Sequence, residues 1–155
     1  MLPLELLRKS ASPYREPNKA FRLAVLNELG VPEFCDFGKF YLEFDFPSSS
    51  NPDCYEQCQD IEPVFLDGVT IDWSKTPIDT SPLLRSAKFA WDVWELPRDC
   101  VCFTSCEGEG GFLCSIQSQK VFDFSLSHRK DFLAGNVAPR WPSFANFLVW
   151  YLAQK

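Results

Sequence analysis

The stretch Asp99–Phe124, DCVCFTSCEGEGGFLCSIQSQKVFDF, predicts the centre of the fold. Its runs Val101–Ser105, Phe112–Ile116 and Lys120–Phe124 have the length and the apolar or β-branched composition of three consecutive strands. The loop Cys106–Gly111 separates the first two runs and contains three glycines in four residues. Because glycine readily adopts the positive φ of a tight or bulged reversal, we expect an antiparallel meander here.

Helices are predicted on the N-terminal side of these strands. Leu4–Lys9 is expected to form a helical turn that buries Leu4, Leu6 and Leu7. Pro17 suits the first turn of a longer helix, and Gly30 is a left-handed cap at its end. The apolar residues between them follow at helical spacing: Phe21, Ala24, Val25 and Leu29.

A second long helix is expected to begin at Asp36, a good N-cap, and to end before Pro47. It carries an aromatic stripe at positions i, i+3, i+4 and i+7: Phe37, Phe40, Tyr41 and Phe44. Such a stripe is far more typical of a core than of a ligand site, so we interpret it as core.

Two further helices are predicted from their caps. Thr80 or Ser81 precedes Pro82, with Leu83, Leu84, Ala87, Ala90 and Trp91 expected to be buried. Ser143 precedes a helix with Phe144, Phe147, Leu148, Tyr151 and Leu152 on one face. Helices first, strands in the centre and a helix at the end predict an α+β fold. We expect one domain over residues 1–155, with a mixed or mostly antiparallel sheet flanked by helices.

Three segments connect these elements. Ser48–Pro63 is polar, acidic and bounded by prolines, which leaves an exposed loop and a short helix as alternatives. Asp67-Gly68 has the signature of a type I′ hairpin turn between Val64–Leu66 and Val69–Ile71. The stretch between Phe124 and Arg140 is interpreted as a polar, basic link.

Composition indicates a protein with its own core. Apolar residues make up 46% of the chain and aromatic residues 15%, and no run approaches the ~18 apolar residues that cross a membrane. The N-terminus lacks the basic prefix of a secretory signal, so we expect a cytoplasmic location and no membrane partner. Seven cysteines in no scaffold-like spacing are expected to be reduced and mostly buried.

The charge is unevenly distributed. Residues 43–109 contain 14 Asp or Glu and 4 Lys or Arg, whereas residues 110–155 contain 2 and 5, within a net charge of −6. An acidic surface repels nucleic acid and attracts basic protein partners. The alternative is that solvated acidic loops keep an aromatic-rich domain in solution.

The residues alone point to no reaction. Cysteine pairs such as Cys54 with Cys58 and Cys100 with Cys102 fall in different kinds of segment, which disfavours one zinc site. His128, the one histidine, lies in a basic stretch and is interpreted as a surface residue. The Gly108–Gly111 turn lacks the Lys-Ser/Thr of a phosphate loop, and Glu107 and Glu109 are interpreted as solvated. We therefore predict no catalytic residue, no metal and no cofactor.

The C-terminal half resembles the SUKH superfamily, the Smi/Knr-type domain of bacterial toxin-immunity proteins and of fungal and other regulatory proteins. The matching pieces occur in order: Glu95-Leu96-Pro97, Thr104–Gly110, Phe112-Leu113, Val121-Phe122-Asp123 and Trp141–Leu148. Leu29-Gly30-Val31-Pro32 before an aromatic helix is similar to the family's opening, so the resemblance spans roughly residues 20–152. The family's Asn-Gly-Gly-type turn is absent here, and the 48–63 segment departs from its pattern.

The resemblance implies a non-catalytic protein that binds a cognate toxin domain, in some cases a nuclease, and occludes its active site. The acidic middle of the chain suits a basic cleft of such a toxin. We expect the contact surface to include Asp53, Tyr55, Glu56, Asp60, Glu62, Glu107 and Glu109. The protein itself is expected to be a monomer or a weak homodimer. A regulatory or scaffold interaction domain, and an enzyme or metal protein that uses Cys100, Cys102 and Cys106, are the alternative hypotheses.

Overall fold

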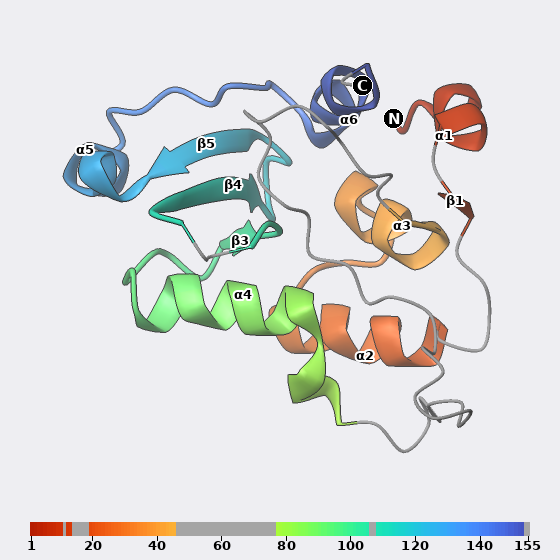
Figure 1. Ribbon diagram of the computed structural model, residues 1–155, viewed down its shortest axis with the longest axis horizontal. Coiled ribbons are helices and arrows are strands. Elements are labelled where there is room, and N and C mark those ends of the chain that lie inside the picture. Colours follow the sequence, from red (N-terminus) through yellow and green to blue (C-terminus); the bar gives the residue numbers. More distant parts are fainter. Residues whose placement is uncertain (11, 14–18, 46–76, 106–107, 154–155) are drawn as a thin grey trace.

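An antiparallel three-stranded sheet lies at the centre of the structure, a computed structural model that describes residues 1–10, 12–13, 19–45, 77–105 and 108–153 (Figure 1). Its strands are β3 (Cys100–Cys102), β4 (Gly110–Ser115) and β5 (Val121–Ser125), in the order β3-β4-β5. The three predicted runs therefore form the predicted meander, with bounds shifted by one to three residues. Helices surround the sheet, which confirms the α+β class.

Alternating residues of the sheet face two apolar clusters. Val101, Phe112 and Val121 belong to the larger cluster, which includes residues of α3 and α6. Cys100, Leu113 and Phe124 belong to a smaller cluster with the end of α4 and with Phe132 of α5. Because helices cover both faces, every residue of β4 is buried.

Helices form where the sequence places caps and apolar stripes. Ser81 caps α4 (Pro82–Asp92) by accepting a hydrogen bond from Leu84 N at 3.2 Å, and Ser143 caps α6 (Phe144–Leu152) by accepting from Asn146 N at 3.1 Å. Gly30 follows α2 (Lys19–Leu29) at φ +73°, the predicted left-handed cap. The other helices that the structure describes before the sheet are α1 (Leu4–Ser10), α3 (Asp36–Glu43) and the 3-10 turn η2 (Ile78–Thr80).

The aromatic stripe of α3 lies in the core, as predicted. The ring of Phe37 lies 5.1 Å from that of Phe144 on α6, and Phe40 lies 5.7 Å from the same ring. Phe147 continues this packing towards the sheet, 5.4 Å from Phe112 of β4. These edge-to-face contacts join helices that are about a hundred residues apart in sequence, so the stripe holds the first and last thirds of the chain together.

Arg22 of α2 is buried against the end of α3. Its Nη1 donates hydrogen bonds to the carbonyl oxygens of Tyr41, at 2.6 Å, and of Phe44, at 3.1 Å. Its guanidinium also stacks on the ring of Tyr41 at 4.9 Å. A cation at the C-terminal carbonyls of a helix is favoured by the helix dipole. This charge therefore acts as a tertiary cap of α3, supplied by a residue about twenty positions away in sequence.

Several expectations about element ends are wrong. Cys35, not Asp36, is the N-cap of α3, since its Sγ accepts a hydrogen bond from Gly38 N. Phe44 lies beyond α3 in a two-residue strand, β2 (Phe44–Asp45), that pairs with β1 (Ser12–Pro13). Leu4 is exposed rather than buried, whereas Leu7 is fully buried.

The stretch from Phe124 to Arg140 is not simply a link. It contains the 3-10 turn η3 (Leu126–His128) and the short helix α5 (Arg129–Leu133). Phe132 of α5 packs 5.4 Å from Phe124, and this contact covers the second face of the sheet. None of the described helices has the length and apolar character needed to cross a membrane. Ser48–Pro63 and the Asp67-Gly68 hairpin lie outside the described residues.

Candidate interaction surface

Glu109 is the one predicted contact residue that the structure describes; Asp53, Tyr55, Glu56, Asp60, Glu62 and Glu107 lie outside the described residues. Glu109 is exposed immediately before β4. Its carbonyl oxygen accepts a hydrogen bond from Leu126 N at 2.7 Å, which ties the start of β4 to the end of β5. The carboxylate is therefore presented from a hydrogen-bonded end of the sheet.

The glycines beside Glu109 do not act as predicted. Among the described glycines, Gly30 and Gly135 have positive φ, and Gly108 and Gly111 do not. At position 111 the requirement is space: a Cβ there would lie 2.6 Å from Thr104 Oγ1 and 3.0 Å from Cys102 Sγ. Thr104 Oγ1 accepts a hydrogen bond from Phe112 N at 3.0 Å, so this close approach fixes how the β3–β4 connection packs.

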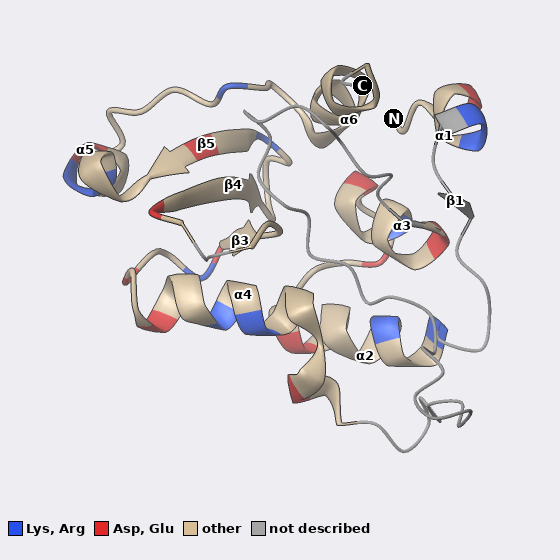
Figure 2. Cartoon of the chain, viewed as in Figure 1, with Lys and Arg blue, Asp and Glu red and all other residues tan. Residues whose placement is uncertain are grey.

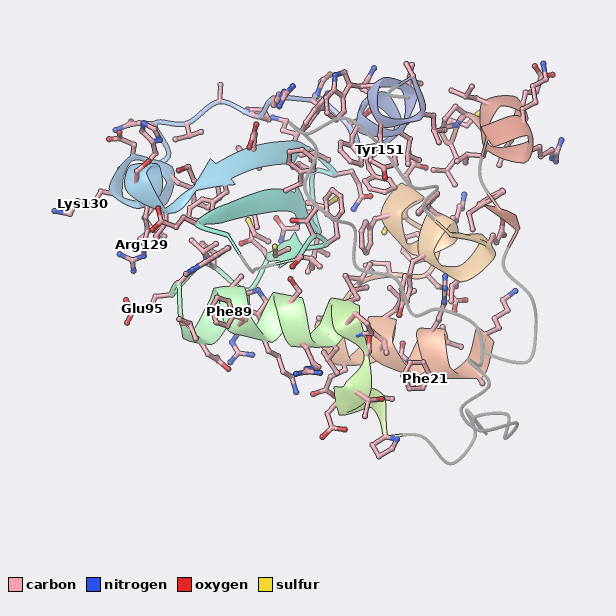
Figure 3. The ribbon with its side chains drawn as sticks, in the orientation of Figure 1. Phe21, Phe89, Glu95, Arg129, Lys130 and Tyr151 are labelled. Atoms are coloured by element: carbon pink, nitrogen blue, oxygen red, sulfur yellow. The ribbon has the colours of Figure 1, made fainter. Side chains whose placement is uncertain are left out.

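A junction between α4 and α5 lies at the same end of the sheet. Arg129 of α5 donates from Nε to the carbonyl oxygen of Trp94 at 2.6 Å, and its Nη2 forms an ion pair with Glu95 Oε2 at 2.8 Å. Glu95 has φ +56°, a left-handed conformation that costs free energy in a residue other than glycine. Arg129 thus holds the turn after α4 in this conformation. Figure 3 shows Glu95, Arg129 and Lys130 at the end of the molecule where α4 and α5 lie.

Exposed apolar side chains flank this junction. Phe89 and Val93 lie four residues apart near the end of α4, and Val93 is 59% exposed. Leu126 of η3, three residues before Arg129, is also exposed, and so is Leu133 of α5, four residues after Arg129. We call Phe89, Val93, Glu95, Leu126, Arg129 and Leu133 the α4–α5 surface. The sequence alone does not reveal this surface, because Leu126 and Leu133 lie in the stretch that was interpreted as a polar link.

The described cysteines are reduced, and their thiols are poor nucleophiles. Burial raises the pKa of Cys100 to about 12, with a smaller contribution from the charge of Asp99. Burial also raises the pKa of Cys114 well above its ordinary value, and that of Cys35 to a smaller extent. A thiol must ionise to attack or to bind metal, so these environments oppose both reactions. The described residues contain no group of three His, Cys, Asp or Glu side chains placed to hold a metal ion.

His128 lies on the surface at the end of η3, as predicted. Its Nδ1 lies 3.2 Å from Ser127 Oγ, and Ser127 Oγ lies 2.9 Å from Ser125 Oγ. Ser127 and His128 are exposed and Ser125 is half-buried, and the three residues lie within one turn of the chain. The arrangement joins neighbouring surface side chains, and among the described residues no carboxylate orients the imidazole as in a catalytic triad.

Positions of Lys or Arg and positions of Asp or Glu are interspersed along the described helices and strands (Figure 2). The unbalanced part of the sequence is residues 46–76, which contain Lys75 as the one cation and six carboxylates: Asp53, Glu56, Asp60, Glu62, Asp67 and Asp72. The acidic character of the chain therefore comes mainly from residues outside the described part. Comparison with models of protein families, with curated proteins and with solved structures finds no match to this chain.

Proposed function

We propose that this chain is a non-catalytic protein-binding domain of the toxin-immunity kind. It binds a cognate toxin domain in the cytoplasm and occludes the active site of that toxin. The resemblance of residues 20–152 to the SUKH superfamily supports this assignment, and so does the order of helices, meander and terminal helix that the family pattern implies.

The observation that carries the proposal is the distribution of charge. Residues 43–109 hold an excess of ten carboxylates over cations, because 14 acidic residues accompany 4 basic ones. The rest of the chain has a small excess of cations, with 11 Lys or Arg and 7 Asp or Glu. An acidic contact surface accelerates encounter with a basic partner, and toxins that cleave nucleic acids have basic substrate clefts.

Glu109 links this argument to the described structure. It is exposed at the end of β4, and its backbone is hydrogen-bonded to Leu126. Because this backbone is already held in place, no further segment of the chain has to become ordered when the Glu109 carboxylate contacts a partner. The entropic cost of binding is therefore lower. We therefore retain Glu109 in the proposed contact surface, together with the acidic residues of the 53–62 stretch.

Co-expression tests the proposal. The chain is co-expressed with the toxin encoded by the adjacent gene, and cell survival and co-purification are measured. Protection of the cells and recovery of a complex support the proposal. Loss of viability together with no complex contradicts it, and capture of housekeeping proteins instead supports the regulatory or scaffold alternative.

Association kinetics test the contact residues. Glu109→Lys is expected to slow association about threefold or more at low salt, with a smaller effect at high salt. Glu33→Lys is the matched control, because Glu33 is also exposed and lies in a different segment, the turn before α3. Equal association rates for the two variants would place the contact surface elsewhere while leaving the immunity function intact.

A further inference from the structure

The link between α5 and α6 lies along the outer side of β5. β5 is the last strand of the central sheet, and β4 pairs with it on one side only. Figure 1 shows the link on the other side of β5, where the chain passes from α5 to α6. We call residues 135–140 of this link the β5 flap. The chain is anchored at both ends of the flap, whereas the flap itself is held mainly by the side chain of Arg140.

The two ends of the β5 flap are fixed to the sheet. Before the flap, Phe132 of α5 packs 5.4 Å from Phe124 of β5. After it, Trp141 exchanges two backbone hydrogen bonds with Val121 of β5, each 3.1 Å long, and its ring is buried. Gly135, the first residue of the flap, has φ +77°, which glycine adopts without strain. Gly135 and Trp141 are therefore placed as the two hinges of the flap.

Backbone pairing between the link and β5 stops at Trp141 for a chemical reason. Val121 and Asp123 are two residues apart, so their outer backbone groups point to the same side of the strand. In the register that pairs Val121 with Trp141, Asp123 would lie opposite Pro139, and proline has no N–H to donate to the Asp123 carbonyl oxygen. Residues 137–140 accordingly make no backbone-to-backbone hydrogen bond with any described residue. What remains along the flap backbone is apolar contact through the half-buried side chains of Val137 and Pro139.

Arg140 supplies the contacts that backbone pairing does not. Its Nη1 forms an ion pair with Asp123 Oδ2 at 2.7 Å. Its guanidinium also stacks on the ring of Trp141 at 4.5 Å and on the ring of Trp150 of α6 at 4.8 Å. A single exposed ion pair contributes little to stability, but here one side chain joins the flap both to β5 and to α6. Loss of this side chain therefore removes three contacts of the flap at once.

We propose that the β5 flap opens and closes while the rest of the domain stays folded, with Arg140 as its latch. In the closed state the flap lies beside Asp123, at the position where a further strand would pair with β5. In the open state the outer N–H and carbonyl oxygen of Asp123 are accessible to solvent. The device thus controls access to the outer edge of the sheet, while Trp141 stays anchored.

The latch is sensitive to salt. The side chains of Arg140 and Asp123 are 42% and 35% exposed, so ions in solution screen their attraction. The anchors at Phe132 and Trp141 consist of apolar packing and backbone hydrogen bonds, which salt screens much less. High ionic strength is therefore expected to open the flap without loosening either anchor.

NMR relaxation of the backbone amides of the full chain tests this proposal. At low salt the order parameters of the Val137, Ala138 and Arg140 amides are expected near the rigid value of about 0.85. In Arg140→Gln the order parameters at these three positions are expected to fall below about 0.6, while those of Phe124 and Trp141 stay unchanged. Addition of about 1 M sodium chloride to the unaltered protein is expected to lower the same three order parameters. Unchanged order parameters in Arg140→Gln overturn the proposal, and so does an equal loss of order at Trp141.

Two further variants separate the latch from a general effect of charge removal. Asp123→Asn removes the ion pair and keeps the two stacks, so an intermediate loss of order is expected in the flap, and salt should then have little further effect. Arg98→Gln is the matched control, because Arg98 is exposed and stacks on Trp91 at 5.2 Å, before β3 and outside the flap. The flap of this control is expected to stay rigid. Loosening of the flap in Arg98→Gln, or an undiminished salt dependence in Asp123→Asn, overturns the proposal.

Discussion

Gly38→Ala is expected to destabilise the protein, although the same change in an ordinary helix is stabilising. Gly38 lies in the first turn of α3, where alanine is favoured over glycine by up to about 1 kcal/mol. Its φ is not in the left-handed range, so the backbone itself accepts alanine. Any loss of stability must therefore come from what the new methyl group meets.

The methyl group meets the turn that precedes α3. A Cβ at position 38 would overlap the carbonyl oxygen of Pro32 and lie 3.1 Å from Glu33 Cα. That oxygen also accepts hydrogen bonds from Cys35 N at 3.3 Å and from Cys35 Sγ at 3.1 Å. Because the obstacle is backbone, it moves only if the turn moves, and the turn includes the N-cap Cys35.

The expected magnitude is the difference between two effects. Overpacking against a fixed backbone costs about 1–3 kcal/mol, and the gain in helix propensity offsets up to about 1 kcal/mol. A net loss of about 1–2 kcal/mol follows. Urea unfolding measures it as a lower midpoint with an unchanged slope, because the surface exposed on unfolding stays the same.

Gly108→Ala is the matched control. A Cβ at position 108 meets no heavy atom within 4 Å, and Gly108 does not have positive φ. The unfolding free energy of the Gly108→Ala variant is expected to stay within about 0.5 kcal/mol of that of the unaltered protein. If Gly38→Ala is as stable as the unaltered protein or more stable, the close packing of the Pro32 turn on α3 is refuted.

Three further changes test other contacts. Arg22→Met leaves the buried carbonyls of Tyr41 and Phe44 without this donor and should cost about 2–4 kcal/mol in urea unfolding; a loss below about 1 kcal/mol would contradict the capping role. Ser143→Ala removes the cap of α6 and should cost about 1 kcal/mol, whereas Ser143→Asp should retain most of the stability. The Cys100 thiol keeps its proton in the folded state up to a pKa of about 12, whereas the unfolded chain loses it near 9.0. The unfolding free energy should therefore fall between these pH values by up to about 1.4 kcal/mol per pH unit on account of this thiol. In Cys100→Ala the unfolding free energy should decline less steeply with pH. An equal slope in the variant and the unaltered protein would contradict the burial of the Cys100 thiol.

Locally encoded features were predicted well. Ser81-Pro82 and Ser143 identify the starts of α4 and α6, because a cap depends on residues within one turn. The three runs of Asp99–Phe124 predict the meander, since strand length, alternation and turn residues all lie within one stretch. The aromatic stripe of α3 predicts core for the same reason: its 3.6-residue period is a property of the helix alone.

Features that depend on distant contacts were missed. Gln119, in the β4–β5 turn, accepts a hydrogen bond from Phe37 N at 2.9 Å, which adds a tertiary contact to the start of α3. Five-residue α5 is too short for a periodic signal, and Phe132 stabilises it by packing on the sheet. Of the seven predicted contact residues the structure describes Glu109 alone, and the contact role of all seven stays a prediction.

The sequence by itself determined the α+β class, the positions of the capped helices and the meander at Asp99–Phe124, because periodicity, caps and turns act over a few residues. Tertiary structure decided which residues fill special positions. It placed the Arg22 charge on the end of α3 and used Gly111 for close packing rather than positive φ. It also brought α4 and α5 together through Arg129. Each of these depends on groups that lie far apart in sequence, and only folding of the whole chain brings such groups within contact distance.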